Sequence, residues 1–486
     1  MSIDPIILQK SVDLRDPHDC TDSGDALALL DAVFAAPVRR RAGGGYAPSL
    51  AESWTVSPDA RHWTLTLRPD LSFHDGRRLD AAAMAASIER MKRPDVGATL
   101  GAPAVWGQYL AGAEIRAVDP RTVSIAAVEP LADLLAILVS AYAVPPEVDE
   151  PGFRERPIGS GPYRVETMRP GAEVRLAAAG WSGGPLANPR LTFRSEPDAD
   201  RRAEAVAAGE AALATRLRAS RHRSGVEEAG RFWTGFTDPT AIIFLLNAAT
   251  GPCADPRVRR ALTLAVDRTD LIARVLDGDG EMLTGFVSAA HFGAAPSSGD
   301  PHDPEAARAL LAEAGYGAGL SLILDTPTRL PDEAQALSAA FAAQLAPLGV
   351  EVSARITEDR VAYAENVRDK RIGDICVFDS SPMSTFRVLY EKIDSRVAGS
   401  WWQGYANPKA EDLLDAARRT TDDAARAVLY GDAYRALQAD PAWVPLYHHS
   451  LGVGAAVPMP VSPVRDDGVL DVTLLPKLTG GEERRA

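Results

Sequence analysis

Cysteine, histidine and catalytic signatures are scarce in this sequence. Its 486 residues include only three cysteines and eight histidines. Cys20, Cys253 and Cys376 lie far apart and form no CxxC pair, so neither a disulfide framework nor a structural zinc site is predicted. The sequence also has no HExxH motif, no P-loop, no GxGxxG after a strand and no GxSxG. We therefore expect no metal site and no cofactor.

Long apolar runs are missing as well. The longest, at residues 131–146, contains Asp133 and is too short to span a bilayer, so no membrane insertion is predicted. Residues 1–10 have no basic region, no apolar core and no cleavage site of a signal peptide, and Cys20 lies in a polar stretch that is no lipobox. As written, the sequence predicts a soluble cytoplasmic protein with free thiols. With a leader upstream, the expectation becomes periplasmic or extracellular.

Positive charge is in deficit. The chain has 66 acidic and 52 basic side chains, a formal net charge of −14. Such a surface repels nucleic acids and anionic lipids, and both are excluded as expected partners. Apolar residues make up 46% of the chain, as in an ordinary folded protein, and the length predicts two or three lobes.

Hydrophobic periodicity predicts an α/β protein. Residues 63–68 and 122–127 read as strands in a strand-rich first half, and residues 25–38 and 81–91 read as helices. From residue 240 to 356 strands alternate with helices, which predicts a lobe with a largely parallel sheet. In this lobe we expect a buried strand at residues 240–247. We also expect two helices that begin with Asp-Pro, at residues 256–276 and 304–315.

Five groups of motifs, in this order along the chain, resemble solute-binding protein family 5, the peptide-, opine- and nickel-type binding proteins of ABC transporters. They are PSLAESW (48–54) with WTLTLRP (63–69) and FHDGR (73–77); PIGSGPY (157–163); FLLN (244–247) with DPRVRRAL (255–262) and AVDR (265–268); DPEAARALLAEAGY (303–316); and GYANP (404–408) with VPLY (444–447). Most of these motifs have structural rather than ligand-binding explanations.

The resemblance implies a class II, cluster C periplasmic-binding-protein fold, a two-lobed Venus flytrap. Lobe I would combine residues 1–45, 157–240 and 447–486, an extra subdomain would span 46–156, and lobe II would span 241–446. The ligand would lie in the cleft between the lobes, and a monomer is the default for this fold.

The resemblance also directs attention to residues 376–387, where the family typically carries a D-x-D-P-like segment that contacts a charged group of the ligand. Here the pattern is replaced, and Asp379 is the one nearby carboxylate, followed by Ser380 and Ser381. Asp379 is a candidate to hold an ammonium group. The alternative is that it caps a turn with the two serines. Arg387 could bind a carboxylate or pair with Glu391 one helical turn later.

Three aromatic residues, Trp401, Trp402 and Tyr405, follow within five positions. Their faces suit a flat or cationic ligand, although paired tryptophans also serve interdomain packing. His448 and His449 are the one histidine pair, and adjacent histidines rarely chelate one ion.

Two functions remain open at this stage. In the first, the chain binds a small amine-bearing or peptide-like solute and delivers it to an ABC permease. In the second, a cytoplasmic protein reuses the fold as a ligand sensor or as an enzyme that condenses or cyclises an aromatic amine. Asp379 would then be the acid–base residue and the tryptophans would stack the substrate.

Overall fold

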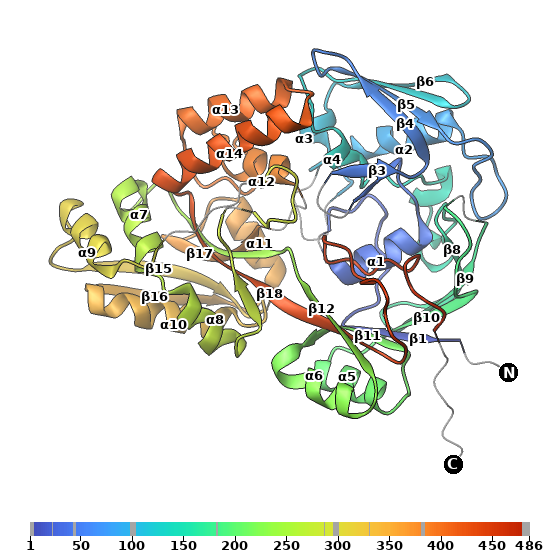
Figure 1. Ribbon diagram of the computed structural model, residues 1–486. Coiled ribbons are helices and arrows are strands. Elements are labelled where there is room, and N and C mark those ends of the chain that lie inside the picture. The colour runs from blue at the N-terminus through green and yellow to red at the C-terminus, as the bar shows by residue number, and fades with distance from the viewer. Residues whose placement is uncertain are drawn as a thin grey trace. The chain divides into compact units, whose positions relative to one another are not determined.

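The computed structural model describes residues 4–21, 23–41, 45–97, 104–180, 183–285, 287–294, 301–329, 331–380 and 384–478. The chain divides into two compact units (Figure 1). Unit 1 comprises Met1–Phe236 with Ser450–Ala486, and unit 2 comprises Thr237–His449. The lobe boundaries predicted at 240/241 and 446/447, and the separate subdomain at 46–156, stay predictions.

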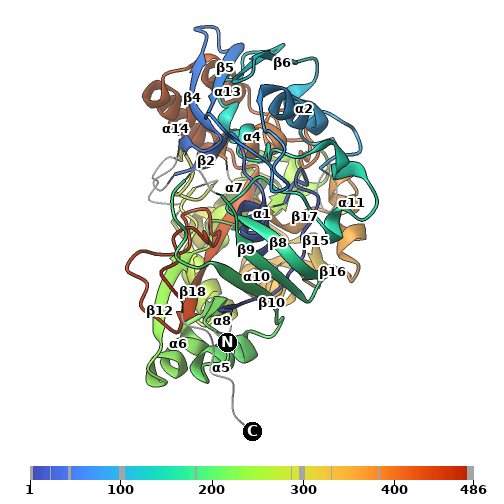
Figure 2. The same ribbon diagram turned by 90° about the vertical axis from the view of Figure 1, so that its right-hand side faces the viewer.

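The larger sheet of unit 1 is mixed, with a parallel centre and antiparallel outer pairs. Across the sheet the strands are β8 (Tyr163–Arg169), β9 (Glu173–Ala178), β10 (Arg190–Ser195), β1 (Ile6–Gln9), β11 (Leu213–Arg218) and the last part of β18 (Trp443–Ala455). Among these described strands, β1 runs parallel to both of its partners, β10 and β11, and the remaining pairs are antiparallel. Figure 2 shows β8, β9 and β10 side by side.

An apolar helix, α1 (Gly24–Val33), packs against this sheet. Its leucines share a core with Val174, Leu191 and Phe193. The helix was expected to reach residue 38 but ends at Val33, because Phe34 is extended and Val38 already begins a strand. Two further helices, α5 (Ala199–Ala207) and α6 (Ala219–Glu228), pack on β11.

The second sheet of unit 1 is a four-stranded antiparallel sheet covered by one helix. Its order is β4 (Ala51–Val56), β5 (His62–Leu67), β7 (Thr122–Ala126) and β6 (Glu114–Asp119). Asp80 accepts hydrogen bonds from the backbone amides of Ala82 and Ala83 and caps α2 (Ala81–Met91), which confirms the helix predicted at 81–91. The short elements are β2 (Val38–Arg40), β3 (Tyr46–Pro48), α3 (Gly107–Leu110), α4 (Leu135–Leu138), η1 (Pro146–Asp149) and η2 (Phe153–Glu155).

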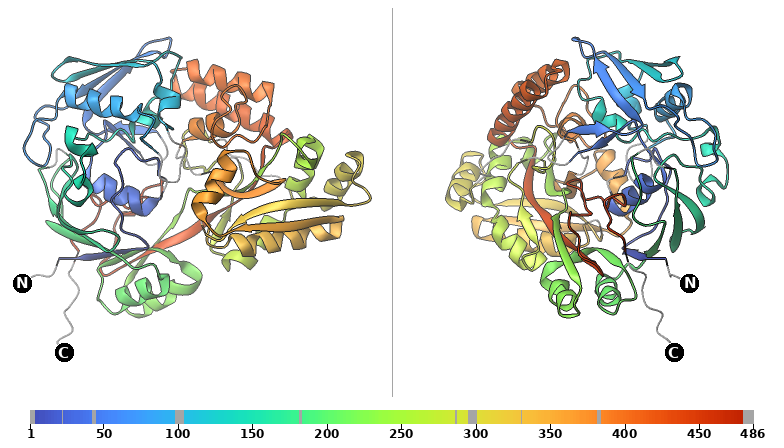
Figure 3. Two further views of the ribbon diagram at one scale, coloured as in Figure 1. Left: turned by 180° about the vertical axis from the view of Figure 1, so that it is seen from behind. Right: turned by 45° about the vertical axis from the view of Figure 1, so that its right-hand side comes forward.

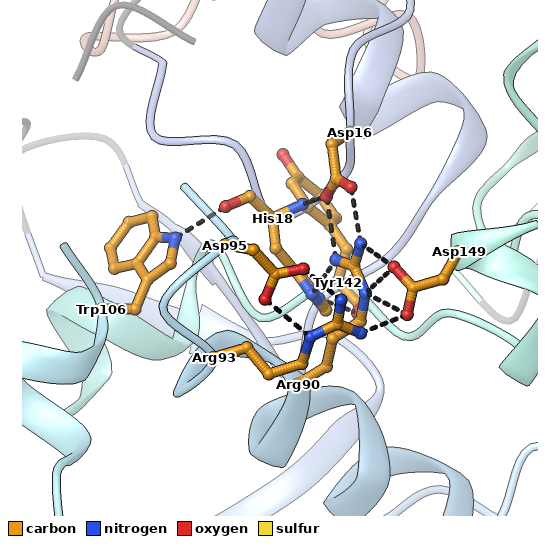
Figure 4. A network of polar contacts seen from close by, with 8 residues as sticks. All are labelled: Asp16, His18, Arg90, Arg93, Asp95, Trp106, Tyr142 and Asp149. Carbon is orange, nitrogen blue, oxygen red and sulfur yellow. Dashed lines mark hydrogen bonds and ion pairs between the residues drawn. The ribbon is translucent and has the colours of Figure 1, made fainter. Parts of the chain in front are cut away.

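A buried polar network joins the N-terminal segment to α2 and η1 (Figure 4). Arg90 donates to both carboxylate oxygens of Asp16 at 2.9 and 2.6 Å, and to Asp149 at 2.8 Å. His18, with no exposed surface, accepts from Arg90 at Nδ1 (3.0 Å) and donates from Nε2 to the carbonyl of Tyr142 (2.8 Å). Burial, together with the Arg90 charge, lowers the pKa of His18 to about 4.

This network predicts acid sensitivity in unit 1. Because the folded state holds the His18 pKa at about 4 instead of the ordinary 6.5, protonation favours the unfolded chain. The neutral ring contributes its full stabilisation above pH 6.5. That stabilisation, at most about 3 kcal/mol, is lost as the pH falls toward 4. In urea titrations, wild type should lose stability relative to H18Q between pH 6.5 and 4.5. Parallel pH profiles for the two proteins would contradict this assignment.

Unit 2 is built on a mixed sheet. Its order is β16 (Val350–Thr357), β15 (Leu320–Pro327), β17 (Ile375–Ser380), β13 (Ala241–Leu246) and the first part of β18, which also pairs with β14 (Gly280–Met282). The neighbours β16, β15 and β17 are parallel, whereas β13 runs antiparallel to both β17 and β18. The expectation of a largely parallel sheet was therefore wrong for half of the sheet. The prediction of a fully buried strand at β13 is confirmed.

The helices of unit 2 follow the predicted caps, with one break. They are η3 (Pro252–Ala254), α7 (Pro256–Ala265), α8 (Arg268–Leu276), α9 (Pro304–Glu313), α10 (Ala334–Leu345), η4 (Ala346–Leu348), α11 (Arg360–Arg368), α12 (Thr385–Lys392), α13 (Pro408–Arg419) and α14 (Asp423–Ala439). The single helix expected at 256–276 is two helices, because Val266 is extended and Asp267 caps the second. The packed pair α13 and α14 appears in orange to red in Figure 3.

The chain passes between the units twice, through β12 (Phe232–Thr237) and through β18. The strand β18 contains a one-residue bulge. Ile242 of β13 pairs with Tyr447, whereas the next residue, Ile243, pairs with Pro445, so Leu446 is the extra residue. Beyond the bulge the alternation of side chains is reversed, which decides the faces on which Tyr447 and His449 project.

Candidate functional site

The predicted site residues of unit 2 begin at the carboxyl end of β17. In α/β sheets, ligands bind beyond the carboxyl ends of the parallel strands. Asp379 and Ser380 are the last two residues of β17, and Asp379 is half-buried. Ser381 lies outside the described residues.

The pleat of β17 separates Asp379 from the predicted tryptophans. The Trp401 ring lies against Phe378, with ring centroids 5.1 Å apart and planes inclined by 48°. Phe378 and Asp379 are consecutive in the strand and therefore project to opposite faces of the sheet. The structure thus brings Trp401 to the end of β17, but on the face opposite to Asp379.

The aromatic segment 401–405 is firmly held. Trp401 and Trp402 are half-buried, and the Trp402 indole donates to the carbonyl of Tyr405 at 2.5 Å. Tyr405 itself is 2% exposed, and its hydroxyl donates to the carbonyl of Asp440 at 2.5 Å. Burial raises the pKa of the Tyr405 phenol. Its ring and hydroxyl are occupied within unit 2, which favours packing over ligand contact for this residue.

Arg387 has the partner that one of its two interpretations predicted. It lies in the first turn of α12, capped by Ser384, and its Nε and Nη2 both donate to Glu391 Oε1, at 3.1 and 3.0 Å. The two side chains are only 4% and 2% exposed. A guanidinium paired this deeply supports the fold of α12, so the site proposed below does not include Arg387.

The face of Asp379 carries a second polar group that the motifs did not single out. Asp379 pairs with Ile242 across the sheet, and Ile242 pairs with Tyr447, so these three side chains share one face. Glu333, just before α10, accepts from the Tyr447 hydroxyl at 3.0 Å. It also accepts from His449 Nε2 at 2.8 Å.

Glu333 is ionised in this setting. Burial raises the pKa of its carboxyl, but the hydrogen bond and charge of His449 outweigh burial, so the net shift is downward. His448 projects away from this group, and its Nδ1 lies 3.2 Å from the carbonyl of Thr240. The histidine pair therefore diverges, as adjacent residues in a strand must.

Unit 1 contains a small cavity of about 70 Å³ lined by Asp31, Arg40, Tyr142, Arg465 and Asp471. Arg465 is the centre of its charges, with Nη2 2.7 Å from Asp31 and 3.0 Å from Asp467. Burial disfavours the Arg465 charge, yet the neighbouring carboxylates of Asp31 and Asp467 prevail and raise its pKa. The charge of Arg465 is thus compensated by neighbouring carboxylates within unit 1.

Neither of these polar groups was predicted, and for a definite reason. The members of the cavity come from residues 31, 142 and 465–471, and Glu333 lies more than a hundred residues before His449. The spacing of residues along the sequence gives no indication of such long-range contacts. The one available signal was the His448-His449 pair, which was assessed for metal binding alone.

Within the described ranges, no three histidine, cysteine or acidic side chains are arranged to hold a metal ion. Among the same residues, no helix is both long and apolar enough to cross a bilayer.

The chain belongs to the bacterial extracellular solute-binding proteins, family 5, because the family's middle-region model matches residues 45–386. Among its relatives is the glutathione-binding protein GsiB of Escherichia coli O1:K1 / APEC, 28% identical over 416 residues, which cover 82% of this chain and 79% of GsiB.

Two solved structures have the same fold. HbpA2 from Haemophilus parasuis matches with a TM-score of 0.80 and 21% identity, over 96% of this chain and 98% of HbpA2. The ABC transporter-associated periplasmic binding protein DppA from Helicobacter pylori, in complex with the peptide STSA, has the same score and identity over 99% of both chains. The predicted α/β, two-lobed periplasmic-binding-protein class is confirmed.

The buried Arg387–Glu391 pair generates a stability prediction. Replacing Glu391 by Gln leaves a buried guanidinium without its counter-charge and should lower the free energy of unfolding by about 3 kcal/mol. The double variant R387M/E391M should recover most of that loss, because neither charge is left buried alone. Denaturant unfolding of the full chain measures both. Single and double variants that are equally destabilised would show that the pair is not the source of the effect.

Proposed function

We propose that this chain binds an amine-bearing, peptide-like solute as the substrate-binding component of an ABC transporter. The observation that carries the proposal is the family match over residues 45–386, combined with a half-buried carboxylate at the end of β17. Asp379 is that carboxylate, placed where α/β sheets bind their ligands. An ammonium group held there would form a charge-assisted hydrogen bond in a partly desolvated setting.

The electrostatics of the chain favour a cationic group. The formal net charge is −14, and Glu333, whose pKa is lowered, adds a second carboxylate on the face of Asp379. A positively charged solute is attracted by such a field, whereas an anion is repelled. The face of Trp401, backed by Phe378, is proposed to contact an apolar or flat part of the solute on the other side of β17.

The named ligands of similar proteins support this solute class. GsiB is named for glutathione, and DppA is in complex with the peptide STSA. Both molecules are short peptides with a free amine. For this chain, an ABC permease is the proposed partner, and the proposed location is periplasmic or extracellular, which depends on an export leader.

The proposed role of Asp379 is tested by calorimetric titration of the ligand-stripped chain with synthetic di-, tri- and tetrapeptides. Replacing Asp379 by Asn should weaken binding of the preferred peptide about 30-fold, equivalent to about 2 kcal/mol, because the ammonium loses its counter-charge. N-acetylation of the same peptide should weaken wild-type binding to a similar degree and D379N binding far less.

The matched control is D412N, which removes an exposed carboxylate from α13 and should bind like wild type. Peptides that bind D379N and wild type equally would remove Asp379 from the site without affecting the proposed function. Failure of every peptide to bind wild type would contradict the function itself.

A further inference from the structure

Arg360 of unit 2 is a buried arginine with no ion-pair partner among the residues that the structure describes. It is the first residue of α11, which follows the parallel strand β16, and only 8% of it is exposed. Its Nε and Nη1 atoms are buried and have no hydrogen-bond partner in the described part of the chain. The guanidinium carbon lies 5.4 Å from the centroid of the Tyr363 ring. A charge that is buried without a partner is destabilising, so its presence needs a physical reason.

The groups around Arg360 do not neutralise its charge. Burial and the Asp325 charge raise the pKa of the Cys376 thiol, although the Arg360 charge opposes them. Burial also raises the pKa of the Tyr363 phenol. Both groups are therefore uncharged at neutral pH. The carboxylate of Asp325 is already paired with Arg355, which donates to its two oxygens at 2.5 and 2.8 Å.

The acidic residue next to Arg360 in the sequence is engaged as well. Asp359 is exposed and caps α11, where its Oδ1 accepts hydrogen bonds from the backbone amides of Val361 and Ala362 at 2.8 and 3.1 Å. An arginine keeps its charge at every relevant pH, and its planar guanidinium matches the geometry of a carboxylate. The buried guanidinium of Arg360 is therefore suited to a carboxylate that comes from outside this group of residues.

The helix α11 packs on the face of β17 that carries Trp401. Tyr363 of α11 contacts the side chain of Cys376. Phe378 follows Cys376 by two residues in β17, so the two side chains project to the same face. The Trp401 ring lies against Phe378 on that face. The start of α11 and the proposed aromatic contact thus belong to one face of the strand that ends in the proposed site.

We infer that Arg360 binds a carboxylate group of the solute at the start of α11. The inference rests on the proposed function and narrows its solute class to zwitterionic peptides, whose free amine meets Asp379 and whose carboxylate meets Arg360. A guanidinium binds a carboxylate through charge-assisted hydrogen bonds, and the positive end of the α11 dipole favours the same charge. The negative net charge of the chain does not prevent this contact, because exposed charges beyond about 8 Å are largely screened at physiological ionic strength.

The test compares a synthetic peptide with its C-terminal amide, which keeps the shape of the peptide and removes its negative charge. The peptide is the one that binds most tightly in the Asp379 experiment. Calorimetric titration of the full, ligand-stripped wild-type chain should show at least about 10-fold tighter binding of the acid than of the amide. R360M should reduce this preference to less than about 3-fold, with the amide bound as before. The control R274M changes an exposed arginine of α8 that pairs with Asp270, and it should keep the full preference.

Denaturant unfolding of the ligand-free chain separates ligand contact from a structural role. Because R360M removes a buried charge that has no described partner, it should not lower the free energy of unfolding. Equal wild-type affinity for the acid and the amide would overturn the inference and leave the proposed function standing. So would an R360M variant that is less stable and binds both peptides equally more weakly. If R360M does not fold, R360Q decides by the same comparison. Failure of wild type to bind any peptide would contradict the proposed function, and the inference with it.

Discussion

One strand, β18, is the constraint on which the rest of this structure depends. Its 13 residues pair with β13 in unit 2 and then with β11 in unit 1, so a single stretch of backbone belongs to both sheets. A strand shared in this way must satisfy the register of two cores. The bulge at Leu446 shifts the register of β18 by one residue. The same extra residue turns Tyr447 and His449 toward the face that carries Asp379. The register of β18 therefore also determines which side chains lie on the face of Asp379.

The end of β17 divides the candidate site chemically as well as geometrically. On one face lie Phe378 and Trp401, an apolar surface. On the other lie the carboxylates of Asp379 and Glu333, of which Glu333 accepts a hydrogen bond from His449. A short peptide with a free amine has both kinds of group. In a chain of net charge −14, this division favours solutes with positive ends.

Local signals made most of the fold predictable. Asp255 and Asp303 cap helices where expected, and β13 is as buried as its run of apolar residues predicted. Predictions failed where residue types alone do not fix the local backbone or the direction of a strand, as at Val266, which is extended and ends α7, and in β13, which runs antiparallel to both of its neighbours.

For the candidate site, the positions of its residues in the fold could be predicted from the sequence, but their contacts could not. Asp379 and Trp401 are both at the end of β17, yet the pleat that separates them depends on register, which residue types do not reveal. The contact of Glu333 could not be predicted, because its partner His449 is distant in the sequence.

The chain is proposed to hold a peptide-like solute and to release it unchanged. Native mass spectrometry of ligand-stripped protein incubated with a peptide pool measures this directly. One peptide per chain, recovered at its original mass, is the predicted result; no complex, or a bound species of altered mass, would contradict it.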